Sequence, residues 1–427
     1  MSETSDCPSD GNFICTDYLF LKPEKAALFD LVRLLWSKDK QKHSFIETTQ
    51  DLEQELKNFW YRWIVFISIL LQKILQFIRI PMALAGRVIE FLVNLVYDNG
   101  GFLKLLINII TGKVVVPKPL SETYRSIIGY LDTRIDLDPK IPMDDPRYPP
   151  ALSIMTAKSS YENPAFIKSV VEHHWKMEVL GRPYDFYNDV TVVAFCGTKP
   201  FNADDWCTDI DLSWVSLSGM GRAHAGFEKA LGLQKMGKSV GWPKEIDMSP
   251  DKPIFAYYKV REVLRQICQE SNNAKFIITG DKEFGEYMKK NLEAYNVRYC
   301  RYVYSNDIVP RVPFDDRIFM YKHFGPCLYY NSCYKGKEMP EEPNKNYCSL
   351  LRIIPMYVNA GWELIRGFIL PYSKGPDYQE GWVQKAFRVF GLLIPGLSAH
   401  GPQDYDNVTR LGRMRMALPQ HPRKKLN

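Results

Sequence analysis

A belt of apolar residues from Phe59 to Ile110 constrains the fold of this chain more than any other feature. Glu90 and Asp98 are its only acidic residues, so a stretch this long must be kept from water by protein or by lipid. Pro81 interrupts the apolar pattern, and a proline inside a helix removes a hydrogen bond and clashes with the preceding turn. We therefore expect three helices, over residues 59–80, 83–96 and 102–110.

The belt has three interpretations: a membrane span, a surface anchor or a buried helical subdomain. Lys73 lies within the first stretch, and a lysine at the centre of a bilayer costs about 3 kcal/mol. The longest run without a charged or amide side chain, Trp63 to Leu71, is shorter than the ~20 residues that a spanning helix needs. We favour an interfacial or hairpin anchor, and the buried subdomain stays the open alternative.

The chain divides into four regions. Residues 1–11 are polar and acidic and lack the basic start and apolar run of a secretory or transit segment, so we expect the chain to begin in the cytosol. Pro117 and Pro119 break the helical pattern after the belt and indicate a boundary. The regions are an N-terminal part over 1–57, the apolar helical anchor over 58–116, an α/β domain over 117–420 and a basic tail over 421–427.

The body of the chain alternates between helical and strand patterns. We expect helices over residues 162–178, 227–233, 256–270 and 282–295, and strands over residues 189–195, 275–279 and 298–304. Such alternation predicts an α/β fold with a largely parallel sheet.

Composition narrows the function classes. The net charge of +6 is too dilute over 427 residues to indicate nucleic-acid binding, so we expect no nucleic-acid partner. The nine cysteines form no CxxC pair, which favours reduced thiols and predicts no metal site.

Two short motifs match the sequence without matching their context. Residues 232–239 read GLQKMGKS, the pattern of a phosphate-binding loop, and residues 237–241 read GKSVG, the pattern of a nucleophile elbow centred on Ser239. Both motifs require a strand before them and a helix after them, whereas a helical pattern leads in and Pro243 follows. Nucleotide binding and a nucleophilic Ser239 therefore remain remote hypotheses.

Several longer segments carry a resemblance to a known family. They include VTVVAFCGTKPFNADDWCTDIDLSW from Val190, AHAGFEKAL from Ala223, RYCRYVYSNDIVPRVPFDD from Arg298 and HGPQDYDNVTRLGR from His400. These segments resemble the class 3 (fungal-type) lipases, and most closely the plant oil-body triacylglycerol lipases. The resemblance covers nearly the whole chain from about Asp17, and the apolar belt is typical of the plant branch.

The resemblance implies a fold, an activity and a location. It implies an α/β-hydrolase domain, class 3 lipase-like, preceded by the apolar helical segment. The implied activity is hydrolysis of triacylglycerol or other acylglycerol esters in lipid catabolism, through a Ser-Asp-His triad and without a cofactor or metal. The implied location is a lipid-droplet or ER membrane surface, on the cytosolic side.

Four residues match site positions of that family. Asp307 matches the triad acid and His400 the triad base, while Thr198 matches the threonine that helps to build the oxyanion hole. Cys196 stands where the family has an arginine, which weakens the support of the loop around Thr198. His224, in a His-x-Gly-Phe element, is expected to have a structural role near the site.

The departure from the family lies between Gly280 and Asp281. Family members continue there into a Gly-His-Ser-Leu-Gly-Gly elbow, a helix and another strand, whereas this chain runs directly into DKEFG. The missing segment would carry the nucleophilic serine and the second oxyanion donor, and its loss would truncate the central sheet. Loss of a triad nucleophile costs on the order of 10⁶ in turnover, so we expect this chain to be inactive. A non-enzymatic lipid-surface binding or scaffolding protein is the alternative.

Overall fold

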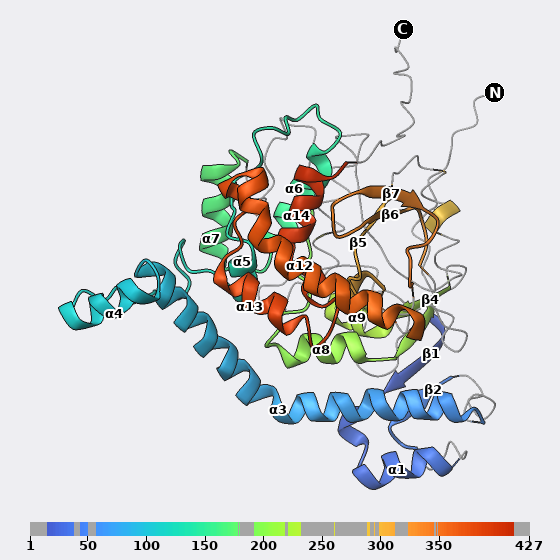
Figure 1. Cartoon of the computed structure of the whole chain (residues 1–427). Coiled ribbons are helices and arrows are strands. Elements are labelled where there is room, and N and C mark those ends of the chain that lie inside the picture. The colour runs from blue at the N-terminus through green and yellow to red at the C-terminus, as the bar shows by residue number, and fades with distance from the viewer. Residues whose placement is uncertain are drawn as a thin grey trace, which may run out of the picture. The chain divides into compact units, whose positions relative to one another are not determined.

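The computed structural model describes residues 15–37, 43–49, 57–177, 192–217, 221–231, 299–311, 323–345 and 349–413, together with residues 179, 260, 288–290, 294 and 347. The chain forms two compact units, and each is described here by itself (Figure 1). Unit 1 comprises Met1–Pro117, Pro183–Tyr299 and Asp315–Phe324. Unit 2 comprises Lys118–Arg182, Cys300–Phe314 and Gly325–Asn427.

An antiparallel sheet lies in unit 1, in the order β2-β1-β3-β4. Its strands are β1 (Cys15–Leu21), β2 (Ile46–Thr48), β3 (Trp214–Leu217) and β4 (Gly221–His224). The short helices of the unit are η1 (Pro23–Lys25), α1 (Leu28–Trp36), α8 (Ala203–Ile210) and α9 (Ala225–Leu231). The backbone N–H of Leu21 donates to the Ser213 hydroxyl at 2.9 Å, which ties β1 to the residue just before β3.

The longest helix, α3 (Phe59–Asp98), contributes its first half to the core of unit 1. Tyr61, Val65 and Ile69 have almost no exposed surface and pack with side chains of β1 and α1. The Ser68 hydroxyl donates to the carbonyl of Ile210 in α8 at 2.7 Å. One side of this half of the belt is therefore packed into the protein core.

The prediction that α3 would end at Pro81 is wrong. The helix continues through Pro81 to Asp98 and changes direction along its length (Figure 1). An interior proline removes one backbone hydrogen bond and crowds one carbonyl, and a long helix accommodates both by bending. On length and composition alone, α3 could also cross a membrane.

A glycine corner joins α3 to the next helix, α4 (Phe102–Thr111). Gly100 and Gly101 have φ values of 76° and 103°, which only glycine adopts readily. Large apolar side chains are exposed from the middle of α3 onward and along α4: Phe77 is 87% exposed, Ile80 80% and Ile110 86%. These exposed apolar side chains set this part of the belt apart from Tyr61, Val65 and Ile69, although Gly86 and Val93 are buried here too.

Unit 2 combines a small sheet with a set of helices. Strands β5 (Arg301–Tyr304), β6 (Cys327–Tyr330) and β7 (Gly336–Met339) lie in that order, with β5 parallel to β6 and β6 antiparallel to β7. The helices are α5 (Ile127–Leu131), α6 (Tyr148–Ser159), α7 (Pro164–Ser169), α12 (Ile353–Lys374), α13 (Trp382–Phe390) and α14 (Pro402–Leu411). One π-helical turn follows α7, and four 3₁₀ turns lie elsewhere: η3 (Val170–His174), η4 (Val309–Arg311), η5 (Leu350–Arg352), η6 (Pro376–Tyr378) and η7 (Ser398–His400).

The core of unit 2 brings the sheet, α12, η7 and α14 together. Its buried apolar residues are Tyr304, Leu328, Tyr330, Tyr334, Leu370, Ala399 and Val408. Ala399 precedes His400 directly, so the packing of this core fixes the position of the turn that carries His400.

The mixed helix-and-sheet class agrees with the sequence prediction, but the details differ. The helix expected over 162–178 appears as α7 and η3, and the strand expected over 298–304 as β5. Residues 192–195, expected in a strand, lie in none, because they pair with no described strand. Among the described strands only β5 and β6 pair in parallel, so the largely parallel sheet is not seen there.

Other predicted elements fall mostly outside the described residues. The strand expected over 275–279 lies outside them entirely. Only residue 260 of the helix expected over 256–270 is described, and it is helical. Of the helix expected over 282–295, residues 288–290 and 294 are described and also helical. The helix expected over 227–233 appears as the end of α9, with its last two residues outside the described range.

Candidate active site

Asp307 and His400 lie in hydrogen-bond contact in unit 2. Asp307 follows the parallel strand β5 after a two-residue turn, and its side chain has no exposed surface. His400 ends η7, directly before α14. The carboxylate oxygen Oδ2 of Asp307 lies 2.8 Å from Nδ1 of His400. The structure therefore brings together two residues that are 93 positions apart in the sequence.

Further donors hold the acid in place. Oδ1 of Asp307 accepts from the backbone N–H of Val309 at 2.9 Å, and Oδ2 accepts from the Tyr405 hydroxyl at 2.5 Å. The Arg311 guanidinium donates to the backbone carbonyls of Asp307 and Ser305. The carboxylate is thus fixed through both oxygens, and the loop that carries it is fixed through its backbone.

This environment makes His400 a stronger base. Burial lowers the pKa of His400, but the Asp307 carboxylate and its hydrogen bond raise it, and the net shift is upward. Because Nδ1 donates to the acid, the neutral ring carries its free lone pair on Nε2. The side chain is 44% exposed, and no described hydroxyl or thiol donates to Nε2. The pair can accept a proton at Nε2, which is the chemistry of a general base.

Thr198 lies in unit 1, and its hydroxyl is engaged. The hydroxyl donates to the carboxylate of Asp209, at the end of α8. The backbone N–H of the following residue, Lys199, donates to Oδ2 of Asp205 at 3.0 Å, which closes the loop onto α8. Since the hydroxyl is used in this way, the role expected of Thr198 would depend on its backbone N–H. Cys196, two residues earlier, is exposed.

His224 ends β4 at a tight corner of unit 1. Its ring lies 4.8 Å from the Phe227 ring, and its Nδ1 lies 3.4 Å from the backbone nitrogen of Phe227. A Cβ on Gly226 would stand 2.7 Å from the backbone carbonyl oxygen of Thr208, so only glycine fits where the start of α9 meets α8. The His-x-Gly-Phe element is thus a packed corner.

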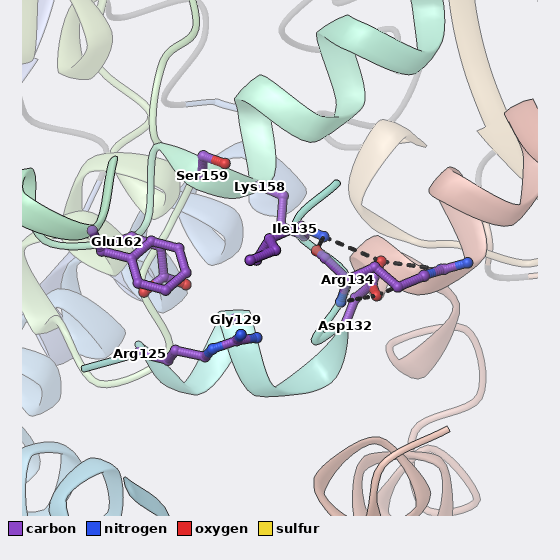
Figure 2. Close-up of a pocket in the computed structure, with 9 residues that line it drawn as sticks. Arg125, Gly129, Asp132, Arg134, Ile135, Lys158, Ser159 and Glu162 are labelled. Carbon is purple, nitrogen blue, oxygen red and sulfur yellow. Dashed lines mark hydrogen bonds and ion pairs between the residues drawn. The ribbon is translucent and has the colours of Figure 1, made fainter. Parts of the chain in front are cut away.

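A small cavity in unit 2 is lined by residues of α5, α6 and the loop before α7 (Figure 2). Asp132 and Arg134 are joined there by hydrogen bonds of 2.8 and 3.0 Å, and Lys158 pairs with Asp132 at 3.4 Å. The space holds no more than about one water molecule. It has no room for an acylglycerol, and the dyad residues do not line it.

Other candidate positions of the sequence are placed as follows. Ser239, the rest of the GLQKMGKS motif and the junction of Gly280 with Asp281 lie outside the described residues. Among the residues that are described, no group of three or more His, Cys, Asp or Glu side chains is arranged to hold a metal ion.

Comparison with curated proteins identifies the family. A triacylglycerol lipase OBL1 from Arabidopsis thaliana is 34% identical over 496 residues, which cover 93% of this chain and 95% of the relative. This chain belongs to the triacylglycerol lipase OBL1 family. The OBL1 of Nicotiana tabacum is 33% identical and covers 83% of the chain, and that of Ricinus communis is 30% identical and covers 96%. No protein-family model and no solved structure matches the chain.

Sequence reasoning missed two residues that support the dyad of this OBL1-family chain. Tyr405 donates to the same carboxylate oxygen as His400, and Arg311 holds the backbone on both sides of Asn306. Tyr405 stands five residues after His400 in the HGPQDY segment. This short spacing was the sequence feature that could have indicated that Tyr405 lies near the dyad. Arg311 gave no signal, because a buried arginine that binds carbonyls cannot be told from a surface arginine by its sequence neighbours.

Proposed function

We propose that this chain is a lipid-surface protein of the triacylglycerol lipase family that retains the acid and base of the triad, Asp307 and His400, but does not hydrolyse esters. The dyad geometry carries the first part of the proposal. The second part rests on the direct junction of Gly280 with Asp281. It is further supported by the alignment with the Arabidopsis relative, which is about a hundred positions longer than the part of this chain that it covers.

The retained residues would each keep one task of ester hydrolysis. Asp307 would hold the His400 ring and stabilise its charged form, while Nε2 would take a proton from an attacking hydroxyl and return it to the leaving alcohol. Thr198 would offer one oxyanion donor through its backbone N–H. Without the serine there is no hydroxyl to deprotonate. Turnover should then be lower by on the order of 10⁶ than in a complete triad.

The substrate class and location follow from the relatives' name and from the belt. Acylglycerols, such as triacylglycerol, are the lipids that the site would face. The exposed apolar residues of α3 after Pro81 and of α4 support attachment to a lipid-droplet or ER membrane surface on its cytosolic side. The first half of α3 is packed into unit 1, which favours a helix that lies on the surface over one that spans it. A binding or scaffolding role at the same lipid surface is the alternative function, because such a role does not require a nucleophile.

Hydrolysis by the purified chain tests the proposal. We expect tributyrin and triolein emulsions to be hydrolysed no faster by the chain than by its Asp307→Ala variant, which serves as the matched control. Release of fatty acid, followed by titration at constant pH, is the measurement. Turnover by the unchanged chain that disappears in Asp307→Ala would show an intact triad and refute the inactivity.

A further inference from the structure

The polarity of α12 is the reverse of what a surface helix in water shows. Its outward side chains are apolar: Ile354 is 76% exposed, Val358 68% and Ile365 55%. Their spacing of four and seven residues places them on one side of the helix. The charged residues of the helix middle, Glu363 and Arg366, are buried. Charged side chains ordinarily face water and apolar ones the core, so this helix is built for another neighbour.

Most inward charges are paired with one another inside unit 2, and Glu363 accepts from the Asn359 amide at 3.0 Å. Arg366 donates to Oδ1 of Asp404 on α14 at 2.6 Å. Arg388 of α13 donates to Oδ2 of Asp404 at 3.0 Å and to Glu380 at 2.6 and 2.7 Å. The Tyr334 hydroxyl completes the set by donating to Asp404 at 2.8 Å. The network fixes the orientation of both helices, so neither can rotate its charges outward without losing these pairs.

Helix α13 repeats the inversion and extends the same surface. Gln384 and Arg388 have almost no exposed surface, whereas Trp382 is 51% exposed and Phe390 46%. The two helices contact each other (Figure 1), and the Lys385 ammonium of α13 lies 4.7 Å from the Phe368 ring of α12. We call their outward side the α12–α13 face, represented by Ile354, Val358, Ile365, Ile369, Trp382 and Phe390.

The charges around this face indicate what covers it. Neither α12 nor α13 carries an exposed acidic residue, whereas Arg352 and Lys374 are exposed at the two ends of α12 and Lys385 is partly exposed beside it. Tyr357, Trp362 and Tyr372 add aromatic side chains with a polar edge, which favour the boundary between water and lipid. The exposed Asp377 lies in η6 between the two helices, and the three basic residues around the face outnumber it, so the charge around the face is positive. An apolar stripe with a positively charged border complements an anionic phospholipid surface.

We propose that the α12–α13 face is a second lipid-contact surface, which binds a phospholipid layer that contains anionic headgroups. The proposal rests on the lipid-surface function above and adds a site outside the apolar belt. Helix α13 contacts η7, where His400 is exposed, so this contact would bring the dyad to the lipid. The face would lie in the headgroup region and would not cross the bilayer.

Flotation of the full-length chain with vesicles tests this surface. The vesicles are phosphatidylcholine alone or phosphatidylcholine with phosphatidylserine, and the lipid-bound fraction gives a partition coefficient. The test variant is Ile354→Asp/Val358→Asp, and Met143→Asp is the control, because Met143 is 77% exposed in unit 2 and belongs to neither α12 nor α13. Both variants are also made in a background that carries Phe77→Asp/Ile80→Asp, called the belt variant. In this background, lipid binding by the α12–α13 face is measured without the contribution of the belt. Circular dichroism and thermal unfolding verify that the variants fold.

We expect the belt variant to retain binding to phosphatidylserine vesicles. In that background the α12 double variant should weaken the partition coefficient by about tenfold or more, since two lipid-buried apolar side chains become charged. Met143→Asp should leave it unchanged, and vesicles without phosphatidylserine should bind less.

Three results would overturn the proposal or its basis. Equal binding by the α12 variant and the control would show that the face does not touch lipid. A dimer that dissociates in Ile354→Asp/Val358→Asp, seen by analytical ultracentrifugation, would instead assign the face to a second copy of this chain. A chain with belt and face intact that binds no vesicle would refute the lipid-surface function itself.

Discussion

At the scale of single residues, the dyad depends on one shared oxygen. Oδ2 of Asp307 accepts from both His400 and Tyr405, while Oδ1 is held by the backbone of Val309. The Asp307 carboxylate has no exposed surface, so it cannot rotate without giving up donors that water would not replace. The ring of His400 is therefore oriented by an acid that is itself fixed, which is what a general base needs.

Replacing Asp307 by asparagine should lower the pKa of His400. Burial lowers the pKa of His400, and the Asp307 carboxylate raises it above the usual 6.5. Without the carboxylate only the effect of burial remains, so the pKa should fall. In the unchanged chain the pair stabilises the fold fully below pH 6.5, and this contribution is lost as pH rises through the raised pKa. NMR titration of the His400 ring, assigned with a His400→Gln variant, gives the value.

Tyr405→Phe is the matched control for that titration. It removes a hydrogen bond to Asp307 but keeps the carboxylate charge, so the pKa of His400 should not fall as it does in Asp307→Asn. An unchanged His400 pKa in Asp307→Asn would mean that the two side chains do not interact in solution.

At the scale of secondary-structure elements, α12, α13 and α14 are joined by buried charges. Asp404 of α14 receives guanidinium groups from α12 and α13, and Glu380 receives the second one as well. Burial raises the pKa of Asp404, but Arg388 and Arg366 outweigh it, and the net shift is downward. These ion pairs add to the apolar contacts of Leu370 in α12 and Val408 in α14.

The Arg388→Met variant should lose about 3–5 kcal/mol in the free energy of unfolding, because the buried Glu380 loses its guanidinium partner and Asp404 keeps only that of Arg366. Arg352→Met, at an exposed arginine, should change it by no more than about 0.5 kcal/mol. Since the pKa of Asp404 is lowered in the folded chain, its stabilisation exists above pH 3.8 and is lost as pH falls. Urea unfolding at pH 7 and in acid should therefore show the gap between Arg388→Met and the unchanged chain narrowing in acid.

Elements with strong periodicity could be predicted from the sequence, and elements that depend on distant partners could not. The belt, the helix at 162–178 and the strand at β5 follow from local patterns. The continuation of α3 through Pro81 depends on packing against α1 and α8, which no local pattern contains. Asp307 and His400 were found through family motifs, whereas Tyr405 and the inverted face of α12 depend on which side of a helix meets the core.

At the scale of the whole molecule, the family assignment and the proposed loss of the elbow lead to different expectations. The alignments cover most of this chain and most of each relative, and the relatives carry the name of a lipase, yet these alignments need more positions than this chain has residues. If the added positions contain the elbow, the chain contains a supporting frame without its reacting group. The frame should then accept the segment back.

Inserting the corresponding segment of the Arabidopsis relative between Gly280 and Asp281 should create ester hydrolysis. The expected gain over the unchanged chain is about 10⁴-fold or more, because the nucleophile and the second oxyanion donor return together. Tributyrin hydrolysis measures the gain, and His400→Gln in the inserted chain should abolish it. A folded insertion chain with no activity, established by cooperative thermal unfolding, would argue that the retained dyad is not a triad remnant.

The burial of Asp307 links the chemistry of the dyad to the stability of the fold. Its carboxylate has no contact with solvent, and the imidazole at position 400 supplies one of the few donors that it has. Substituting His400 by an aliphatic residue would therefore remove a hydrogen-bond donor from a buried negative charge, and it would also remove the base. An amide side chain at position 400 can still donate a hydrogen bond to the Asp307 carboxylate, but it cannot transfer a proton. The Asp307–His400 pair is therefore also a structural contact, and a chain without ester hydrolysis would still need it.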